Sequence, residues 1–103
     1  MKYKIIYEQI AITDIINLIK YISMDLLAEG AARSLFDKLV SEITSLEYLP
    51  NRNPTVSEPP YNLLQIKKMV IDNYVVFYKV NEKLKEVHIL RVLNMRQHWQ
   101  DYL

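Results

Sequence analysis

The feature that most constrains the fold of this chain is a change in hydrophobic spacing on either side of a proline-rich segment. All four prolines lie between positions 50 and 60, and proline is excluded from helix interiors and central strands because it lacks an amide hydrogen. Before this segment apolar residues recur at three- and four-residue steps, whereas after it they gather in strand-length runs rich in Val, Ile, Tyr and Phe. The chain is therefore predicted to form helices first and a sheet afterwards.

Two amphipathic helices are predicted before the prolines. Five isoleucines form the apolar stripe of the first, over about residues 10–23: Ile12, Ile15, Ile16, Ile19 and Ile22. A second, longer stripe runs from Ala28 to Leu46 and stops before Pro50. Because residues 24–29 leave room only for a turn, the helices are expected to form an αα-hairpin whose apolar side needs another surface to cover it.

Four strand-length runs are predicted to form the sheet: residues 3–7, 63–70, 74–80 and 86–93. The last three are joined by a tight turn at Asp72-Asn73 and by residues 81–85, connections so short that successive strands must be antiparallel.

The end of the chain, residues 94–103, has Met95, Trp99 and Leu103 at four-residue spacing and predicts a short terminal helix that packs on the sheet. The predicted order is therefore β-α-α-β-β-β-α, an α+β fold in which the αα-hairpin packs on a mainly antiparallel four-stranded sheet. At this length, residues 1–103 are expected to form a single domain.

The net charge is close to zero. The chain has 13 Lys and Arg against 12 Asp and Glu, whereas a protein that neutralises many phosphates is usually strongly basic. The charge is also uneven, because residues 1–60 hold 6 basic and 8 acidic side chains and residues 61–103 hold 7 and 4. The sheet half is modestly basic, which either reflects acidic, solvated helix surfaces or indicates a sheet face that meets an anionic partner.

Cysteine is absent, which excludes a disulfide scaffold, a thiolate zinc site and a cysteine nucleophile, and fits a reducing compartment. The first residues alternate in polarity and lack the apolar run of a signal peptide, and the longest apolar stretches are far too short to span a bilayer. We therefore expect a soluble cytoplasmic protein without a membrane partner.

Several residue patterns fall in the predicted elements in a fixed order. The helices contain Ala11, Asp14-Ile15, Ile19, Tyr21-Ile22 and Ala32, followed by Leu46 and Pro50. Residues 73–80 read Asn-Tyr-Val-Val-Phe-Tyr-Lys-Val, and residues 87–93 read Val-His-Ile-Leu-Arg-Val-Leu, followed by Arg96 and Trp99. This ordered set resembles the RelE/ParE toxin superfamily along nearly the whole chain, in particular its ParE-like and plasmid-stabilisation members.

The resemblance implies the toxin of a bacterial type II toxin–antitoxin module, neutralised by a cognate antitoxin in a hetero-oligomer, and no cofactor is expected. RelE-like members cleave mRNA at the ribosome, whereas ParE-like members inhibit DNA gyrase. Many ribonuclease members carry an arginine in the strand that corresponds to residues 74–80, where this chain has Val75 and Val76. Gyrase inhibition by protein binding is therefore our first hypothesis, and ribosome-dependent mRNA cleavage is the alternative.

For a ribonuclease, the best available catalytic set is Arg91, Arg96, His98 and Tyr102, since RNA cleavage needs a cation near the scissile phosphate and groups for proton transfer. Arg91 is predicted to share a strand face with Val87 and Ile89, where an unpaired charge is unfavourable. It therefore needs either a carboxylate inside the fold or a phosphate outside it. His98 and Tyr102 are four residues apart, so one helix face would present both, as an acid–base pair or as a solvated surface.

Three further sets of residues have a structural as well as a functional interpretation. Lys67 and Lys68 lie where ribonuclease members often hold RNA, but adjacent strand residues face opposite sides, so at most one lines a site, and both can instead protect a sheet edge. Trp99 is interpreted as a core residue rather than a platform for base stacking. His88 has neither a cysteine nor a second histidine nearby, so no metal site is predicted.

Overall fold

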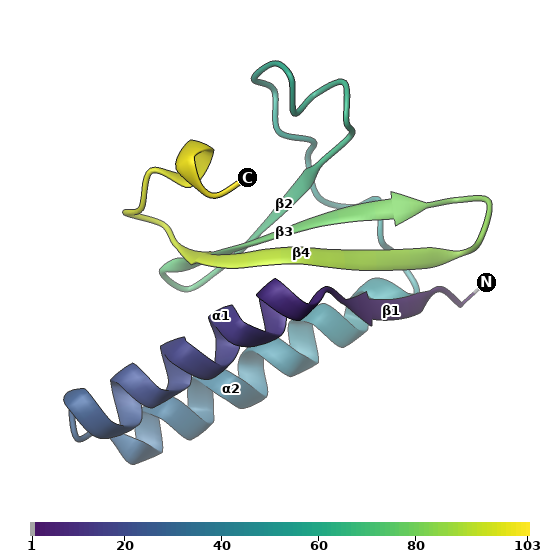
Figure 1. The fold of residues 1–103 in the computed structure, drawn as a ribbon. Coiled ribbons are helices and arrows are strands. Elements are labelled where there is room, and N and C mark those ends of the chain that lie inside the picture. Colours follow the sequence, from purple (N-terminus) through teal and green to yellow (C-terminus); the bar gives the residue numbers. More distant parts are fainter. Residues whose placement is uncertain (1) are drawn as a thin grey trace.

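The computed structural model describes residues 2–103 and consists of a helical hairpin lying against one face of a four-stranded sheet (Figure 1). The strands are β1 (Lys4–Tyr7), β2 (Lys67–Ile71), β3 (Tyr74–Asn81) and β4 (Glu86–Asn94). The helices are α1 (Gln9–Lys20), continued by a π-helical turn at Tyr21–Asp25, and α2 (Glu29–Thr44), continued by a 3₁₀ turn at Ser45–Glu47. None of the helices in this part of the chain is long and apolar enough to cross a bilayer.

The strand order in the sheet is β1-β4-β3-β2. The first strand is parallel to the last one, while the β2–β3 and β3–β4 pairs are antiparallel. Because β1 ends opposite Ile89, the edge of β4 beyond this point is free of a neighbouring strand, and α1 begins beside it. The predicted α+β fold, an αα-hairpin on a mainly antiparallel four-stranded sheet, is confirmed.

The main core lies between the hairpin and the sheet. The helical segments contribute Ala11, Ile15, Leu35, Leu39, Ile43 and Leu46. The strands contribute Met69, Ile71, Val76, Tyr78, Val87, Ile89 and Val92. The hydroxyl of the buried Tyr78 donates a hydrogen bond to the carbonyl of Pro50 (2.7 Å) and accepts one from Asn53 (3.1 Å), so the proline segment is tied to this core.

The opposite face of the sheet, which we call the outer face, carries a second and smaller cluster formed by Val56, Ile66, Phe77 and Leu93. The ring of Trp99 packs on it, with its centroid 5.4 Å from that of Phe77 and 5.0 Å from that of Tyr61. The loop before β2 and the C-terminal segment both lie above this face in Figure 1. Trp99, interpreted from the sequence as a core residue, packs against this cluster as a partly buried side chain.

The strand predicted at residues 63–70 begins later, at Lys67. The amides of Leu63 and Leu64 donate to the carbonyl of Pro60, and the amide of Gln65 donates to that of Asn62. Gln65 also has a positive φ of 58°, a conformation that is incompatible with a strand. The proline loop therefore continues to residue 65, and its turn hydrogen bonds replace the expected sheet pairing.

The terminal helix predicted at residues 94–103 is wrong, because the structure has only a 3₁₀ turn at Trp99–Asp101. The side-chain oxygen of Asn94 accepts a hydrogen bond from the amide of Arg96 (2.9 Å), and that of Gln97 accepts one from the amide of Asn94 (2.8 Å). Such local bonds compete with helical ones. Met95, expected to pack on the sheet, is 49% exposed.

Candidate functional site

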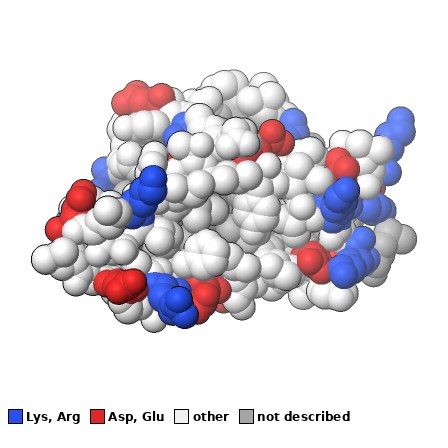
Figure 2. Space-filling model, turned by 60° about the horizontal axis from the view of Figure 1, so that its bottom comes forward, with Lys and Arg blue, Asp and Glu red and all other residues white. Residues whose placement is uncertain are grey.

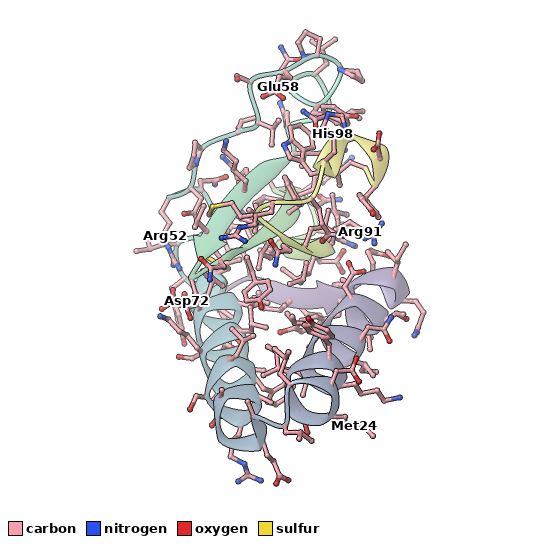
Figure 3. All side chains as sticks on the ribbon, turned by 90° about the vertical axis from the view of Figure 1, so that its left-hand side faces the viewer. Met24, Arg52, Glu58, Asp72, Arg91 and His98 are labelled. Atoms are coloured by element: carbon pink, nitrogen blue, oxygen red, sulfur yellow. The ribbon has the colours of Figure 1, made fainter. Side chains whose placement is uncertain are left out.

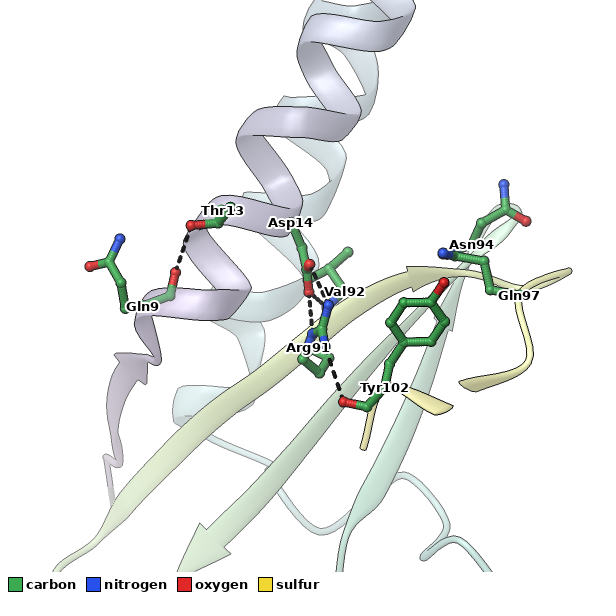
Figure 4. A network of polar contacts seen from close by, with 8 residues as sticks. All are labelled: Gln9, Thr13, Asp14, Arg91, Val92, Asn94, Gln97 and Tyr102. Carbon is green, nitrogen blue, oxygen red and sulfur yellow. Dashed lines mark hydrogen bonds and ion pairs between the residues drawn. The ribbon is translucent and has the colours of Figure 1, made fainter. Parts of the chain in front are cut away.

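Arg91 lies in β4 just beyond the end of β1, where α1 runs beside the strand. Its Nε and Nη2 atoms each donate a hydrogen bond of 2.8 Å to the carboxylate of Asp14 (Figure 4). The same carboxylate accepts the amide of Val92 at 3.0 Å. The two charged side chains are 13% and 12% exposed. Of the two partners considered for Arg91, the structure contains the carboxylate inside the fold.

The sheet face on which Arg91 lies differs from the prediction. The register between β3 and β4 shifts at a bulge that contains Leu90. Before the bulge, Val87 and Ile89 belong to the main core; after it, Arg91 lies opposite Phe77, a member of the second cluster. Directly opposed residues share a sheet face. Arg91 therefore starts from the outer face and not from that of Val87 and Ile89.

Tyr102 joins this ion pair from the C-terminal segment. Its carbonyl accepts a hydrogen bond of 3.0 Å from Nη1 of Arg91, and its ring centroid lies 5.4 Å from the guanidinium carbon. The hydrogen bonds to Asp14 raise the pKa of Arg91 above its ordinary value, so the guanidinium stays protonated. Every nitrogen of this guanidinium thus already has an acceptor within the chain.

A groove of about 410 Å³ opens between α1 and the end of β4 beside this network. Its polar and aromatic walls consist of Asp14, Asn17, Tyr21, Tyr74, Arg91, Asn94, Gln97 and Tyr102. Arg91 is the one cationic residue among them, and Asp14 neutralises it. The groove offers aromatic rings and amides, but no cation that is free to meet a phosphate.

Arg96 and His98 do not join Arg91. Both are exposed, and Nδ1 of His98 lies 3.3 Å from the carboxylate of Asp101. Figure 3 shows His98 beside the loop that carries Glu58, away from Arg91. The predicted pairing of His98 with Tyr102 on one helix face is wrong, because a 3₁₀ turn aligns residues three apart and not four apart.

Lys67 and Lys68 lie in β2, the strand at the other edge of the sheet. The ammonium of Lys67 donates to the carbonyl of Asn53 (3.2 Å) and to the hydroxyl of Thr55 (3.5 Å), so this side chain fastens the proline segment. Lys68 is exposed and lies opposite Phe77, which places it on the outer face. As strand geometry requires, only one of the two lysines is on the face that carries Arg91.

The side of the αα-hairpin that faces away from the sheet carries exposed apolar side chains. Figure 2 shows a broad uncharged area with Lys, Arg, Asp and Glu gathered around it. Phe36 is 44% exposed and lines a shallow groove of about 380 Å³ with Ile19. Ile16 and Val40, each about one turn away on the same helices, are 47% and 39% exposed. We call these four residues the hairpin patch.

Asp14 is the site residue that sequence reasoning missed, because it entered only as part of a family pattern. A usable signal existed, since Asp14 is the one acidic residue of α1 and borders the predicted isoleucine stripe. Among residues 2–103, no three His, Asp or Glu side chains gather as metal ligands would.

Comparisons with known proteins identify the family of the chain and structures with a similar fold. Residues 5–99 match the family model described as ParE toxin of type II toxin-antitoxin system, parDE. No match among curated protein sequences reaches significance. A chromosomal ParDE toxin–antitoxin structure from P. aeruginosa superposes with a TM-score of 0.73 at 14% identity and covers 92% of this chain and 98% of the matched one.

Two RelE structures are similar as well. The archaeal RelE–RelB complex from Pyrococcus horikoshii has a TM-score of 0.65 at 16% identity, covering 94% of this chain and 99% of that one. A mutant of the toxin RelE from E. coli in the free state has a TM-score of 0.64 at 14% identity, covering 93% and 86%. These likenesses show a shared fold, and the family match over residues 5–99 shows that the chain belongs to the ParE toxin family of type II toxin–antitoxin systems.

Proposed function

We propose that this type II toxin acts by binding DNA gyrase and does not cleave RNA. The observation that carries the proposal is the closed ion pair between Arg91 and Asp14, with both hydrogen bonds at 2.8 Å. Arg91 is the strand arginine best placed for catalysis in the sequence, yet its charge is balanced inside the fold. Paired with Asp14, Arg91 holds α1 against β4. Its guanidinium then has a structural role, and the surface around it can serve to bind a protein partner.

RNA cleavage makes demands that the remaining candidates meet poorly. The transition state requires a cation at the phosphate and an acid and a base near the reacting oxygens. His98 is separated from Arg91 and paired with Asp101, and Arg96 is exposed on the terminal segment. Lys67 is engaged with the proline segment. These positions support a binding protein rather than a ribonuclease.

Ribosome-dependent mRNA cleavage is the second candidate, and one observation favours it. The ring of Tyr102 lies 5.4 Å from the guanidinium carbon of Arg91, and both side chains line the same groove. A phenol and a cation at one opening are groups that phosphodiester cleavage uses. For this reason the experiment below includes a readout of RNA cleavage.

We infer that a cognate antitoxin covers the hairpin patch in a toxin–antitoxin hetero-oligomer. The patch combines Ile16, Ile19, Phe36 and Val40, and Figure 2 shows charged side chains around an uncharged centre. A groove between two helices with an apolar floor and a charged rim suits the apolar face of an amphipathic helix. The P. horikoshii structure is a RelE–RelB complex, and the P. aeruginosa structure belongs to a ParDE toxin–antitoxin system.

Induction of the toxin without antitoxin tests the target. Plasmid supercoiling and the 5′ ends of cellular mRNA are measured in parallel after induction, with Arg96→Ala and Tyr102→Phe as matched variants. We expect loss of negative supercoiling with intact mRNA, in the wild type and in both variants. Codon-phased mRNA cuts that disappear in either variant would establish the ribonuclease instead.

A binding assay tests the partner surface. Phe36→Glu places a charge in the hairpin patch, whereas Leu84→Glu does the same at an apolar residue that is 64% exposed in the β3–β4 connection. We expect calorimetry to show at least a tenfold weaker antitoxin affinity for Phe36→Glu and an unchanged affinity for Leu84→Glu, with equal unfolding midpoints. Equal affinities for both variants would exclude the hairpin patch as the antitoxin site.

A further inference from the structure

His88 is held between two carboxylates on the outer face of the sheet. Its Nδ1 lies 2.9 Å from Oε1 of Glu8, and its Nε2 lies 3.0 Å from Oε1 of Glu86. Glu86 precedes it by two residues in β4, whereas Glu8 is 80 positions away, between β1 and α1. The imidazole therefore joins the start of α1 to the last strand, next to the parallel β1–β4 pair.

The chemistry of the three groups determines the protonation that this arrangement needs. An ionised carboxylate only accepts hydrogen bonds, and a neutral imidazole has a single N–H. Both contacts of His88 are therefore made at once only when both ring nitrogens carry a proton. The hydrogen bonds that the protonated ring donates to Glu8 and, to a smaller extent, to Glu86 raise the pKa of His88 above its ordinary value of 6.5.

The other charged groups around His88 do not replace its contacts with Glu8 and Glu86, so the doubly protonated imidazole remains favoured. Lys79 lies opposite it on β3, and Lys4 lies opposite Glu86 on β1. Glu82 and Lys83 of the β3–β4 connection line the same groove of about 580 Å³ as His88. Within residues 2–103, neither Lys4 nor Lys79 forms an ion pair with the two carboxylates that hold the imidazole.

We propose that His88 is a pH-sensitive latch that fastens the β1–α1 junction to β4 while doubly protonated and releases Glu8 when it loses one proton. Glu8 is the contact that opens, because it is the more exposed carboxylate, at 45% against 24% for Glu86. Glu86 belongs to the same strand as His88 and stays beside it. The Glu8 carboxylate forms no cap on α1, so the latch is its main contact.

The latch gives the molecule a defined pH response. Because the pKa of His88 is higher in the folded chain than in the unfolded one, the stabilisation is fully present below about pH 6.5 and is lost as the pH rises through the folded-state pKa. The loosened region is the base of α1, where the amide of Glu8 donates to the carbonyl of Ile89 at 3.0 Å. This helix also carries Asp14, so the latch supports the element that positions the Arg91 ion pair.

An NMR titration of the full chain tests the latch. His98→Gln leaves His88 as the only imidazole, so its ring signals are unambiguous. We expect its midpoint above pH 6.5 and the backbone amide signals of Glu8 and Tyr7 to shift with the same midpoint. A midpoint at or below 6.5, or junction amides that stay unchanged while the ring titrates, would overturn the proposal.

Charge-removing variants provide the matched comparison. Glu8→Gln is expected to lower the His88 midpoint, whereas Glu29→Gln, exposed in the first turn of α2, leaves it unchanged. In a double-mutant cycle of His88→Gln and Glu8→Gln, measured by urea unfolding, the coupling is expected at pH 6 and absent at pH 9. Equal coupling at both values would show that the contact does not depend on protonation.

Discussion

Replacing Asp14 by alanine leaves the guanidinium of Arg91 and the amide of Val92 without their shared acceptor. Three hydrogen bonds of 2.8–3.0 Å to the carboxylate are lost, two of them from the charged guanidinium. Removing one partner of a buried ion pair destabilises a protein by about 3–5 kcal/mol. Arg91 keeps its bond to the carbonyl of Tyr102 and lines an open groove through which water can enter. We therefore expect the free energy of unfolding to fall by about 2–3 kcal/mol.

Urea unfolding followed by circular dichroism measures this change. With a slope of roughly 1.5 kcal/mol per molar urea, the midpoint of Asp14→Ala should fall by about 1.3–2 M. Asp37→Ala is the control, because Asp37 is exposed on α2 and has no ion pair within residues 2–103; its effect should stay below about 0.5 kcal/mol. Equal midpoints for the two variants, or additive effects of Asp14→Ala and Arg91→Ala in the double variant, would refute a structural ion pair.

Three further predictions concern packing and pH. Tyr78→Phe removes the hydroxyl that donates to the carbonyl of Pro50 and should cost about 1 kcal/mol in urea unfolding; an unchanged midpoint would show that this bond does not hold the proline segment. Trp99→Ala should lower the free energy of unfolding by about 2–3 kcal/mol and accelerate amide exchange in the terminal segment and the second cluster. A uniform acceleration over the whole chain would contradict this. The hydrogen bond from Tyr3 lowers the pKa of Glu82, so the stability that this carboxylate contributes above pH 4.5 is lost as the pH falls through its lower folded-state pKa. Glu82→Gln should therefore lose less stability than the wild type between about pH 5 and pH 3, and identical pH profiles would contradict this.

The order and type of the main elements could be predicted because they depend on local periodicity. Ile15 and, less fully, Ile19 and Ile22 of the predicted stripe pack in the main core, as do the alternating residues of β3, whereas Ile16 is 47% exposed on the other side of the helix. Periodicity predicted the wrong secondary structure where side chains form hydrogen bonds with nearby backbone amides or where a turn replaces the strand. Asn94 and Gln97 bond to nearby amides and prevent a terminal helix, and Gln65 adopts a positive φ before β2.

The candidate site was less predictable because its contacts join distant positions. Arg91 could be recognised as needing a partner, yet Asp14 lies 77 residues away and meets it only once β4 is placed beside α1. The bulge at Leu90, which moves Arg91 to the outer face, leaves no mark in the alternation of apolar residues. Of the two carboxylates that hold His88, Glu86 is two residues away in the sequence, whereas Glu8 is 80 residues away and comes close only through the parallel pairing of β1 with β4.

A supercoiling assay with purified components separates a protein target from an RNA target. The toxin is added to DNA gyrase, ATP and relaxed plasmid, and in parallel to ribosomes that are translating a defined mRNA. We predict dose-dependent loss of supercoiling, restored by antitoxin, together with an mRNA that stays intact. Full supercoiling at saturating toxin, together with mRNA cleavage at the ribosome, would contradict the proposal that this ParE-family chain acts by binding a protein.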